Sequence, residues 1–112
     1  MTRDTYKKKL EANTVHFEDT MAVIDAYFDF FPTAFKNGET FNKEGENNGS
    51  CKLFAFAKKE GYSEQQTLQA FGDFYRKDVL EHPNEANHAN IRNFIKFGWG
   101  GIAFDGEPLK LK

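Results

Sequence analysis

Residues 47–57 read Asn-Asn-Gly-Ser-Cys-Lys-Leu-Phe-Ala-Phe-Ala, and the rest of the chain is organised around them. The first half ends the most polar loop of the sequence, and the second half is apolar except at one lysine. Ser50 offers the side-chain oxygen of a helix N-cap, and Gly61 is the residue type that ends helices in a left-handed conformation. The sequence therefore predicts a buried helix from about Ser50 to Glu60.

The composition indicates one domain built on aromatic side chains. The chain has 112 residues, of which 39% are hydrophobic and 16% are Phe, Tyr or Trp. This length suits one domain with one core, and large rings let a few residues bury a substantial area. We expect residues 1–112 to form a single domain in which residues 1–14 fray, because the first helix is short.

Two helices are expected before the central stretch. Residues Thr2–Leu10 predict a short one. From Phe17 to Phe28, apolar residues recur at spacings of four, three and four, which is the stripe of a helix with 3.6 residues per turn.

Two helices are expected after it. Ser63 opens a capping box with Gln66, so the first runs from Glu64 to about Leu80. Gly72 inside this segment marks a close helix crossing. Asn87 caps a further helix, which Gly98 closes.

Short strand-like segments flank two turn signals. Asn37-Gly38 lies between Thr33–Lys36 and Glu39–Phe41, and Asp105-Gly106 lies between Gly100–Phe104 and Leu109–Leu111. Asn-Gly and Asp-Gly are the residue pairs that a two-residue hairpin prefers. The chain is therefore expected to be a mainly helical α+β domain, with about four to five helices and a small antiparallel sheet made from two short hairpins.

Charge and hydropathy exclude two classes of partner. Fifteen Lys and Arg against seventeen Asp and Glu give a net charge of −2, which removes the usual attraction to nucleic acid and to anionic membranes. No stretch approaches the roughly eighteen apolar residues of a membrane span, and the N-terminus lacks the apolar region of a secretory signal. We expect a soluble, cytoplasmic protein with no nucleic-acid partner and no membrane insertion.

Cys51 is the only cysteine, and it raises the question of nucleophilic catalysis. A thiol in the first turn of a helix faces the positive end of the helix dipole, which lowers its pKa. A cysteine nucleophile also needs a base and an orienting group, and the sequence offers His88 and Asn93. The alternative interpretation is that Cys51 is a small buried hydrophobic residue.

Other polar residues are candidates for binding rather than for chemistry. Asn47 and Asn48 lie in a polar loop of the kind that positions functional groups, and Trp99, between glycines, has the side chain of a binding anchor. Its alternative role is packing over a helix. His82 and His88 have no recognised metal-ligand spacing with neighbouring acids, so no metal and no cofactor is expected.

Several blocks of the sequence together resemble a known family. The blocks are residues 16–25 (His-Phe-Glu-Asp-Thr-Met-Ala-Val-Ile-Asp), 32–38 (Pro-Thr-Ala-Phe-Lys-Asn-Gly), 47–52 (Asn-Asn-Gly-Ser-Cys-Lys), 72–76 (Gly-Asp-Phe-Tyr-Arg) and 91–94 (Ile-Arg-Asn-Phe) with Gly98-Trp99. In order and spacing they resemble the HopJ type III effector family over about Val15 to Gly106. Two departures are Phe31, where a polar residue is usual, and Gly100, where Asp is usual.

The resemblance implies an effector that a bacterial type III system delivers into a host cell, and it carries no established reaction. The expected function is therefore binding of a protein or a small molecule. The alternative is a cysteine-dependent hydrolase or acyltransferase that uses Cys51 and His88.

Overall fold

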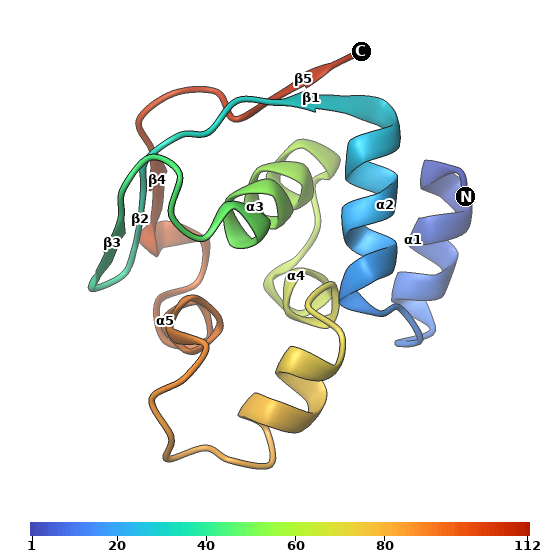
Figure 1. Ribbon diagram of the computed structural model, residues 1–112. Coiled ribbons are helices and arrows are strands. Elements are labelled where there is room, and N and C mark those ends of the chain that lie inside the picture. Colours follow the sequence, from blue (N-terminus) through green and yellow to red (C-terminus); the bar gives the residue numbers. More distant parts are fainter.

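Helix α3 (Asn48–Glu60) lies at the centre of the computed structural model, which describes residues 1–112 (Figure 1). Its buried side chains are those of Cys51, Leu53, Phe54, Ala55, Phe56 and Ala57. Because successive helical residues are about 100° apart, Phe54 and Phe56 point to opposite sides of α3. The helix therefore separates the aromatic core into two halves.

The two halves of the core have different ring partners. Phe56 contacts the rings of Tyr6, Phe28 and Tyr62, with centroid distances of 5.7, 5.9 and 5.8 Å. Phe54 contacts four other rings, at centroid distances between 5.0 and 6.4 Å: Phe35, Phe71, Phe94 and Trp99. Such ring pairs stabilise a fold beyond the area that they bury.

The remaining helices surround α3. Helices α1 (Arg3–Glu11) and α2 (Phe17–Tyr27) lie on one side, as predicted. Helix α4 (Glu64–Gln69), the π-helical turn η1 (Phe74–Val79) and helix α5 (Ala89–Phe97) lie below it in Figure 1. No helix has both the length and the apolar character needed to cross a membrane.

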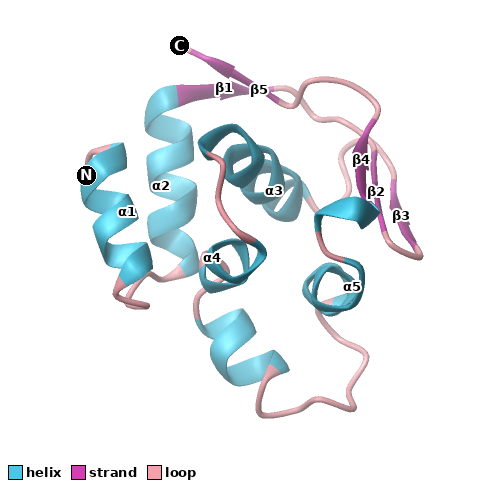
Figure 2. Cartoon of the chain, turned by 180° about the vertical axis from the view of Figure 1, so that it is seen from behind, coloured by secondary structure: helices cyan, strands magenta, loops and turns pink.

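The strands form two small antiparallel sheets, so the mainly helical α+β class is confirmed and the single sheet is not (Figure 2). Strand β1 (Phe28–Phe30) pairs with β5 (Leu109–Leu111). Strand β2 (Phe35–Asn37) pairs with both β3 (Thr40–Asn42) and β4 (Ile102–Phe104), which follows the 3-10 turn η2 (Trp99–Gly101).

The predicted hairpin around Asp105-Gly106 is wrong, because β4 and β5 pair with strands from the first half of the chain. Phe104 lies opposite Phe35, with the ring centroids 5.8 Å apart, and this contact holds β4 against β2. The Phe31 backbone N–H donates to the Pro108 carbonyl oxygen at 2.7 Å, which extends the β1–β5 pair.

The first hairpin exists, but its turn is one residue later than predicted. Asn37 pairs with Thr40, so Gly38 and Glu39 are the central residues. Only Gly38 of this group has a positive φ, of 59°. The Asn37 side chain is instead fully buried and hydrogen-bonded, which keeps this residue in the strand.

Two helices begin at residues other than the predicted caps. Helix α3 has Asn47 as its N-cap residue instead of Ser50, and α5 has His88 instead of Asn87. Both caps have left-handed backbone conformations, with φ of 51° and 54°. Asn87 is engaged elsewhere, because its side-chain oxygen accepts a hydrogen bond from Arg92 at 2.8 Å.

The helix predicted from Glu64 to Leu80 is broken at Gly72. This residue has φ of +65°, and a Cβ atom there would lie 2.8 Å from the backbone nitrogen of Phe17. The close approach expected at Gly72 is therefore real, but it involves the start of α2 and ends α4. The capping box of Ser63 and Gln66 at the start of α4 is confirmed.

Candidate functional site

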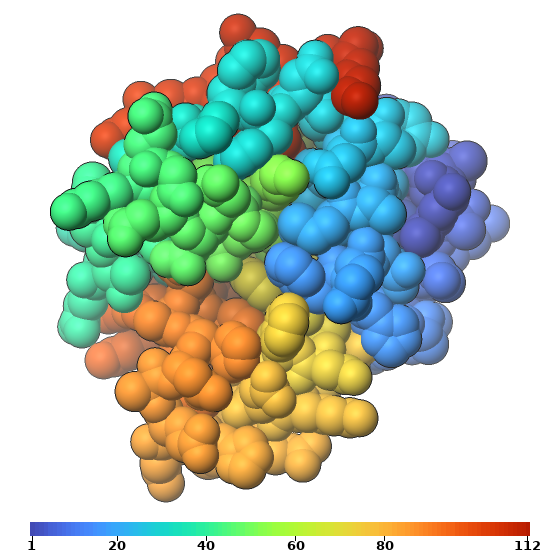
Figure 3. Space-filling view, in the orientation of Figure 1, coloured from blue at the N-terminus to red at the C-terminus, as the bar shows by residue number.

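The main cavity lies where the starts of α2, α3, η1 and α5 meet, on the face shown in Figure 3. Its volume is about 360 Å³. The side chains and backbone that line it come from these segments and from β3: Phe17, Thr40, Asn47, Gly49, Ser50, Phe71, Phe74, His88, Ala89, Asn90 and Ile91. No Lys, Arg, Asp or Glu belongs to this lining.

One wall of the main cavity is aromatic. The ring of Phe17 stacks on Phe71 at 6.3 Å and meets Phe74 edge-on at 5.3 Å. A Cβ atom at Gly49 would lie 2.9 Å from the Phe17 ring, so the absence of a side chain at Gly49 lets this ring pack against the start of α3. The three rings together offer an apolar surface to a bound molecule.

A second hollow of about 250 Å³ shares this wall. It is lined by Phe17, Phe71 and Phe74 from the main cavity, and by His16, Glu18 and Asp73 on its other side. Asp73 has cations nearby, because Arg76 and Lys77 lie 3.7 and 3.8 Å from its carboxylate oxygens. Glu18 and Asp73 therefore line the second hollow and not the main cavity.

His88 is held at the edge of the main cavity by two contacts. Its Nε2 lies 3.1 Å from Asp78 Oδ2, and its ring lies 5.2 Å from that of Phe74. An Asp–His contact of this kind orients an imidazole and selects its tautomer. The sequence identified His88 as a candidate, but its orienting partner is Asp78 and not Asn93.

Four asparagines form a network that runs from the interior to the main cavity. Asn37, Asn42 and Asn90 are 0%, 1% and 6% exposed. Asn37 donates to Asn90, Asn90 and Asn42 donate to each other, and Asn47 donates to Asn42 at 2.7 Å. Since buried polar groups require partners, this network ties β2, β3, α3 and α5 together.

Two of the helix N-termini at the main cavity, those of α3 and α5, differ from the other helix starts. The lining includes the first turns of α3 and α5, and neither turn contains an acidic residue or a side-chain cap hydrogen bond. Helices α1, α2 and α4 all carry an acidic residue in the first turn. The positive ends of two helix dipoles therefore face the same space.

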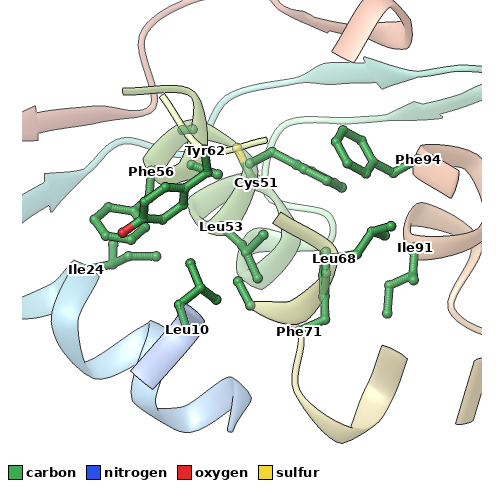
Figure 4. Close-up of a cluster of buried hydrophobic side chains, with 14 of the residues drawn as sticks. Leu10, Ile24, Cys51, Leu53, Phe56, Tyr62, Leu68, Phe71, Ile91 and Phe94 are labelled. Carbon is green, nitrogen blue, oxygen red and sulfur yellow. The ribbon is translucent and has the colours of Figure 1, made fainter. Parts of the chain in front are cut away.

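Cys51 lies in the core (Figure 4) and does not line the main cavity. It is 0% exposed, and its thiol donates a hydrogen bond to the Thr33 carbonyl oxygen, with 3.5 Å between the atoms. Burial raises the pKa of the Cys51 thiol to about 11, and the hydrogen bond with Thr33 opposes this only in part. His88 belongs to the cavity lining and Cys51 does not, so the geometry gives no support to a Cys51–His88 pair.

The other residues singled out from the sequence have separate positions. Asn93 donates to Thr40 Oγ1 at 2.8 Å and joins α5 to β3. Asn48 is exposed and does not line the main cavity. Trp99 is half-buried: its indole N–H donates to the Tyr62 carbonyl oxygen at 3.2 Å, and its ring packs on Phe54 and Phe94, which favours the packing role.

The acids and histidines around Pro83 form two separate pairs. One is His88 with Asp78, and the other is His82 with Glu85, at 3.8 Å. The structure contains no group of three or more His, Cys, Asp and Glu side chains arranged to hold a metal ion.

Sequence reasoning missed most of the cavity. The sequence predicts Asn37 as a turn residue and Phe17 as part of the apolar stripe of a helix. The available signal was the number of asparagines near predicted element ends, but it gave no indication that Asn37, Asn42, Asn47 and Asn90 would meet.

Comparison with known proteins identifies the family. The model of the HopJ type III effector protein family matches residues 3–109. The crystal structure of the unknown function protein VPA0580 is similar to this chain, with 46% sequence identity and a TM-score of 0.97, over 100% of this chain and 95% of that one. A comparison with curated proteins gives no match. Since the family model spans nearly the whole length, the chain belongs to the HopJ type III effector protein family.

Proposed function

We propose that this HopJ-family domain acts by binding a small molecule in the main cavity. The observation that carries the proposal is that this cavity combines aromatic side chains with polar ones. Phe17, Phe71 and Phe74 supply apolar rings, and Asn47, Asn90 and His88 supply polar groups. Small-molecule sites usually combine apolar walls with a few well-placed polar groups, in volumes of about 300–1,000 Å³.

Two polar residues of the cavity lining, Asn90 and His88, are held in place by other side chains, which supports binding by a preformed site. Asn90 is held through its hydrogen bonds with Asn37 and Asn42, and His88 is held by Asp78 and Phe74. Groups that are already oriented lose little conformational entropy when a ligand binds. The domain is therefore suited to recognise a ligand without rearranging its core.

A fragment screen by NMR tests the proposal. Ring-bearing small molecules are titrated into ¹⁵N-labelled protein, and the expected result is a set of shifts at Phe17, Asn47, Phe74 and His88. Ala89→Phe is expected to abolish these shifts, because Ala89 lines the main cavity and a ring there occupies it. Ala86→Phe is the matched control, since Ala86 is exposed in the preceding loop and lies outside the lining.

Two results would contradict small-molecule binding at this site. One is the absence of any fragment that shifts the cavity residues. The other is a set of shifts that persists unchanged in a folded Ala89→Phe protein.

The family relationship supports a second proposal, that a type III secretion system delivers the domain into a host cell. The test is a fusion of this chain to a translocation reporter in a bacterium with and without a working system. Reporter signal in host cells only with the working system is expected. Retention of the fusion inside the bacterium under inducing conditions would refute delivery and leave the binding proposal untouched.

A further inference from the structure

We infer that Asn47 is the specificity-determining residue of the main cavity, and that it presents a fixed carbonyl oxygen to an uncharged ring-bearing ligand with an N–H donor. This inference rests on the proposed small-molecule function and names the chemistry of the ligand. It comes from the direction in which hydrogen bonds run through the four asparagines.

The backbone carbonyl oxygens of Asn90 and Phe35 fix the direction of these hydrogen bonds, because a carbonyl oxygen can only accept. The Asn37 side-chain atom that lies 2.7 Å from the Asn90 backbone oxygen must be the NH₂ group. The same NH₂ group lies 3.1 Å from the side chain of Asn90, so the atom facing it there is Oδ1. Asn90 Nδ2 then lies on the other side and donates to Asn42 Oδ1 at 3.0 Å.

The orientation of the Asn42 amide in turn fixes the orientation of the Asn47 amide. Its Nδ2 donates to Asn90 Oδ1 at 3.1 Å and faces the Phe35 backbone oxygen at 3.4 Å, which agrees with the orientation derived from Asn37. Its Oδ1 therefore accepts, and the Asn47 atom 2.7 Å away must be Nδ2. A reversed Asn47 amide would place two acceptors in contact. The carbonyl oxygen of Asn47 is thus the amide atom that the asparagine network does not use, and Asn47 lines the main cavity.

The remaining lining defines the rest of the ligand. The rings of Phe17, Phe71 and Phe74 favour a planar apolar group. The lining contains no Lys, Arg, Asp or Glu side chain, so a charged ligand would find none of these side chains to pair with there. The dipoles of α3 and α5 favour an anion, but the effect of helix ends is modest at sites open to solvent. An uncharged ligand with a donor at Asn47 therefore fits this site best.

Three matched probes test the inference: benzamide, N,N-dimethylbenzamide and benzoate. They share the ring, but only benzamide has an N–H donor, and only benzoate is charged. NMR titration is expected to show that benzamide binds at the main cavity about two- to tenfold more tightly than the dimethyl compound, which is the effect of one net hydrogen bond. Asn47→Ala should remove this preference, whereas Asn48→Ala, at the adjacent residue that does not line the cavity, should keep it.

The outcomes separate this inference from the proposed function. Equal affinity for benzamide and its dimethyl derivative in the unmodified protein would overturn the role of Asn47 and leave small-molecule binding intact. Tighter binding of benzoate would overturn it as well, because the helix dipoles would then govern the site. If none of the three probes binds while other fragments reach the cavity, the inferred ligand chemistry is wrong. If no fragment binds there at all, both small-molecule binding and the role of Asn47 are refuted.

Discussion

Cys51 shows how a side chain's neighbours override its position along a helix. Its place in the first turn of α3 favours a low thiol pKa, yet its surroundings are those of the core. Burial penalises the thiolate, and one hydrogen bond to Thr33 compensates only in part, so the pKa of the thiol rises to about 11. Desolvation is the larger of the two effects.

Alkaline pH should therefore act on Cys51 in two ways. Iodoacetamide should leave the folded protein nearly unmodified at pH 8, because little thiolate forms there. Stability should fall as pH rises from about 9 to about 11, since the folded protein keeps a proton that the unfolded chain loses. Alkylation rates and guanidinium unfolding between pH 8 and 10 measure both effects.

Cys51→Ala is the control for the alkaline fall in stability. Tyr6, with its pKa raised to about 12, and Tyr62, with its pKa also raised, add to the fall at higher pH and are still present in this variant. The variant should lose stability less steeply between pH 9 and 10 than the unmodified protein. Rapid alkylation at pH 8 without unfolding would contradict the burial of the thiol.

Gly72 is a second residue whose tertiary contacts override a prediction from the sequence, because the helix predicted through it is broken there. Gly72→Ala should destabilise the protein by about 3 kcal/mol, because it adds the strain of a left-handed alanine to a contact with the Phe17 backbone. Gly61→Ala is the matched control: φ is +71° and nothing lies within 4 Å, so only about 1–2 kcal/mol of strain is expected. Chemical denaturation of both variants compares the two, and equal losses would contradict the close approach of α2.

At the scale of elements, helix starts divide into two groups. Helix α4 starts with a reciprocal capping box of Ser63 and Gln66. At α1 the Thr5 backbone N–H donates to the Thr2 hydroxyl, and at α2 the His16 backbone N–H donates to the Asp19 carboxylate. Helices α3 and α5 start at residues with left-handed backbone and no side-chain cap bond. Both of these starts border the main cavity, together with the start of α2.

The difference between helix starts predicts unequal effects of two serine substitutions. Ser63→Ala should cost about 1 kcal/mol, because the Gln66 backbone N–H loses its acceptor at 3.1 Å. Ser50→Ala should change the unfolding free energy by less than about 0.5 kcal/mol, since Ser50 lies inside the first turn of α3 and is not its cap. Thermal and denaturant unfolding measure both, and a larger loss for Ser50→Ala would restore Ser50 as the cap.

At the scale of the molecule, α3 couples two ring clusters into one core. Phe56 belongs to the cluster with α1 and β1, and Phe54 to the cluster with α5 and Trp99. Both side chains are 0% exposed and belong to one helix, so neither cluster is formed without the other. Small domains with such a shared element unfold cooperatively.

Phe56→Ala tests this coupling. The variant should lose about 3–5 kcal/mol of stability, the usual effect of removing a buried phenylalanine ring. Trp99 fluorescence, which reports the other cluster, should shift together with far-UV circular dichroism. Phe41→Ala is the control, since Phe41 is 58% exposed and should change stability little. Separate transitions for the two probes would show that the halves unfold independently.

The candidate site was only partly predictable from the sequence. Asn47 and His88 were identified and both line the main cavity, whereas Cys51, Asn93 and Trp99 have structural contacts outside it. The contact between Asn37 and Asn90 was not predictable, because they are 53 residues apart and each resembles a turn or cap residue locally. Only the folded chain shows that they share a hydrogen bond.

By itself, the sequence determined the helices around α3, the capping box of α4 and the mainly helical α+β class. These features depend on caps and apolar spacings within a few residues, so they can be predicted from the local sequence. The tertiary structure alone decided the two-sheet pairing, the break at Gly72, the direction of the asparagine network and the cavity at which it ends. Each of these arises from contacts between distant segments, and it is this packing that determines which polar groups are buried and which are left to bind a ligand.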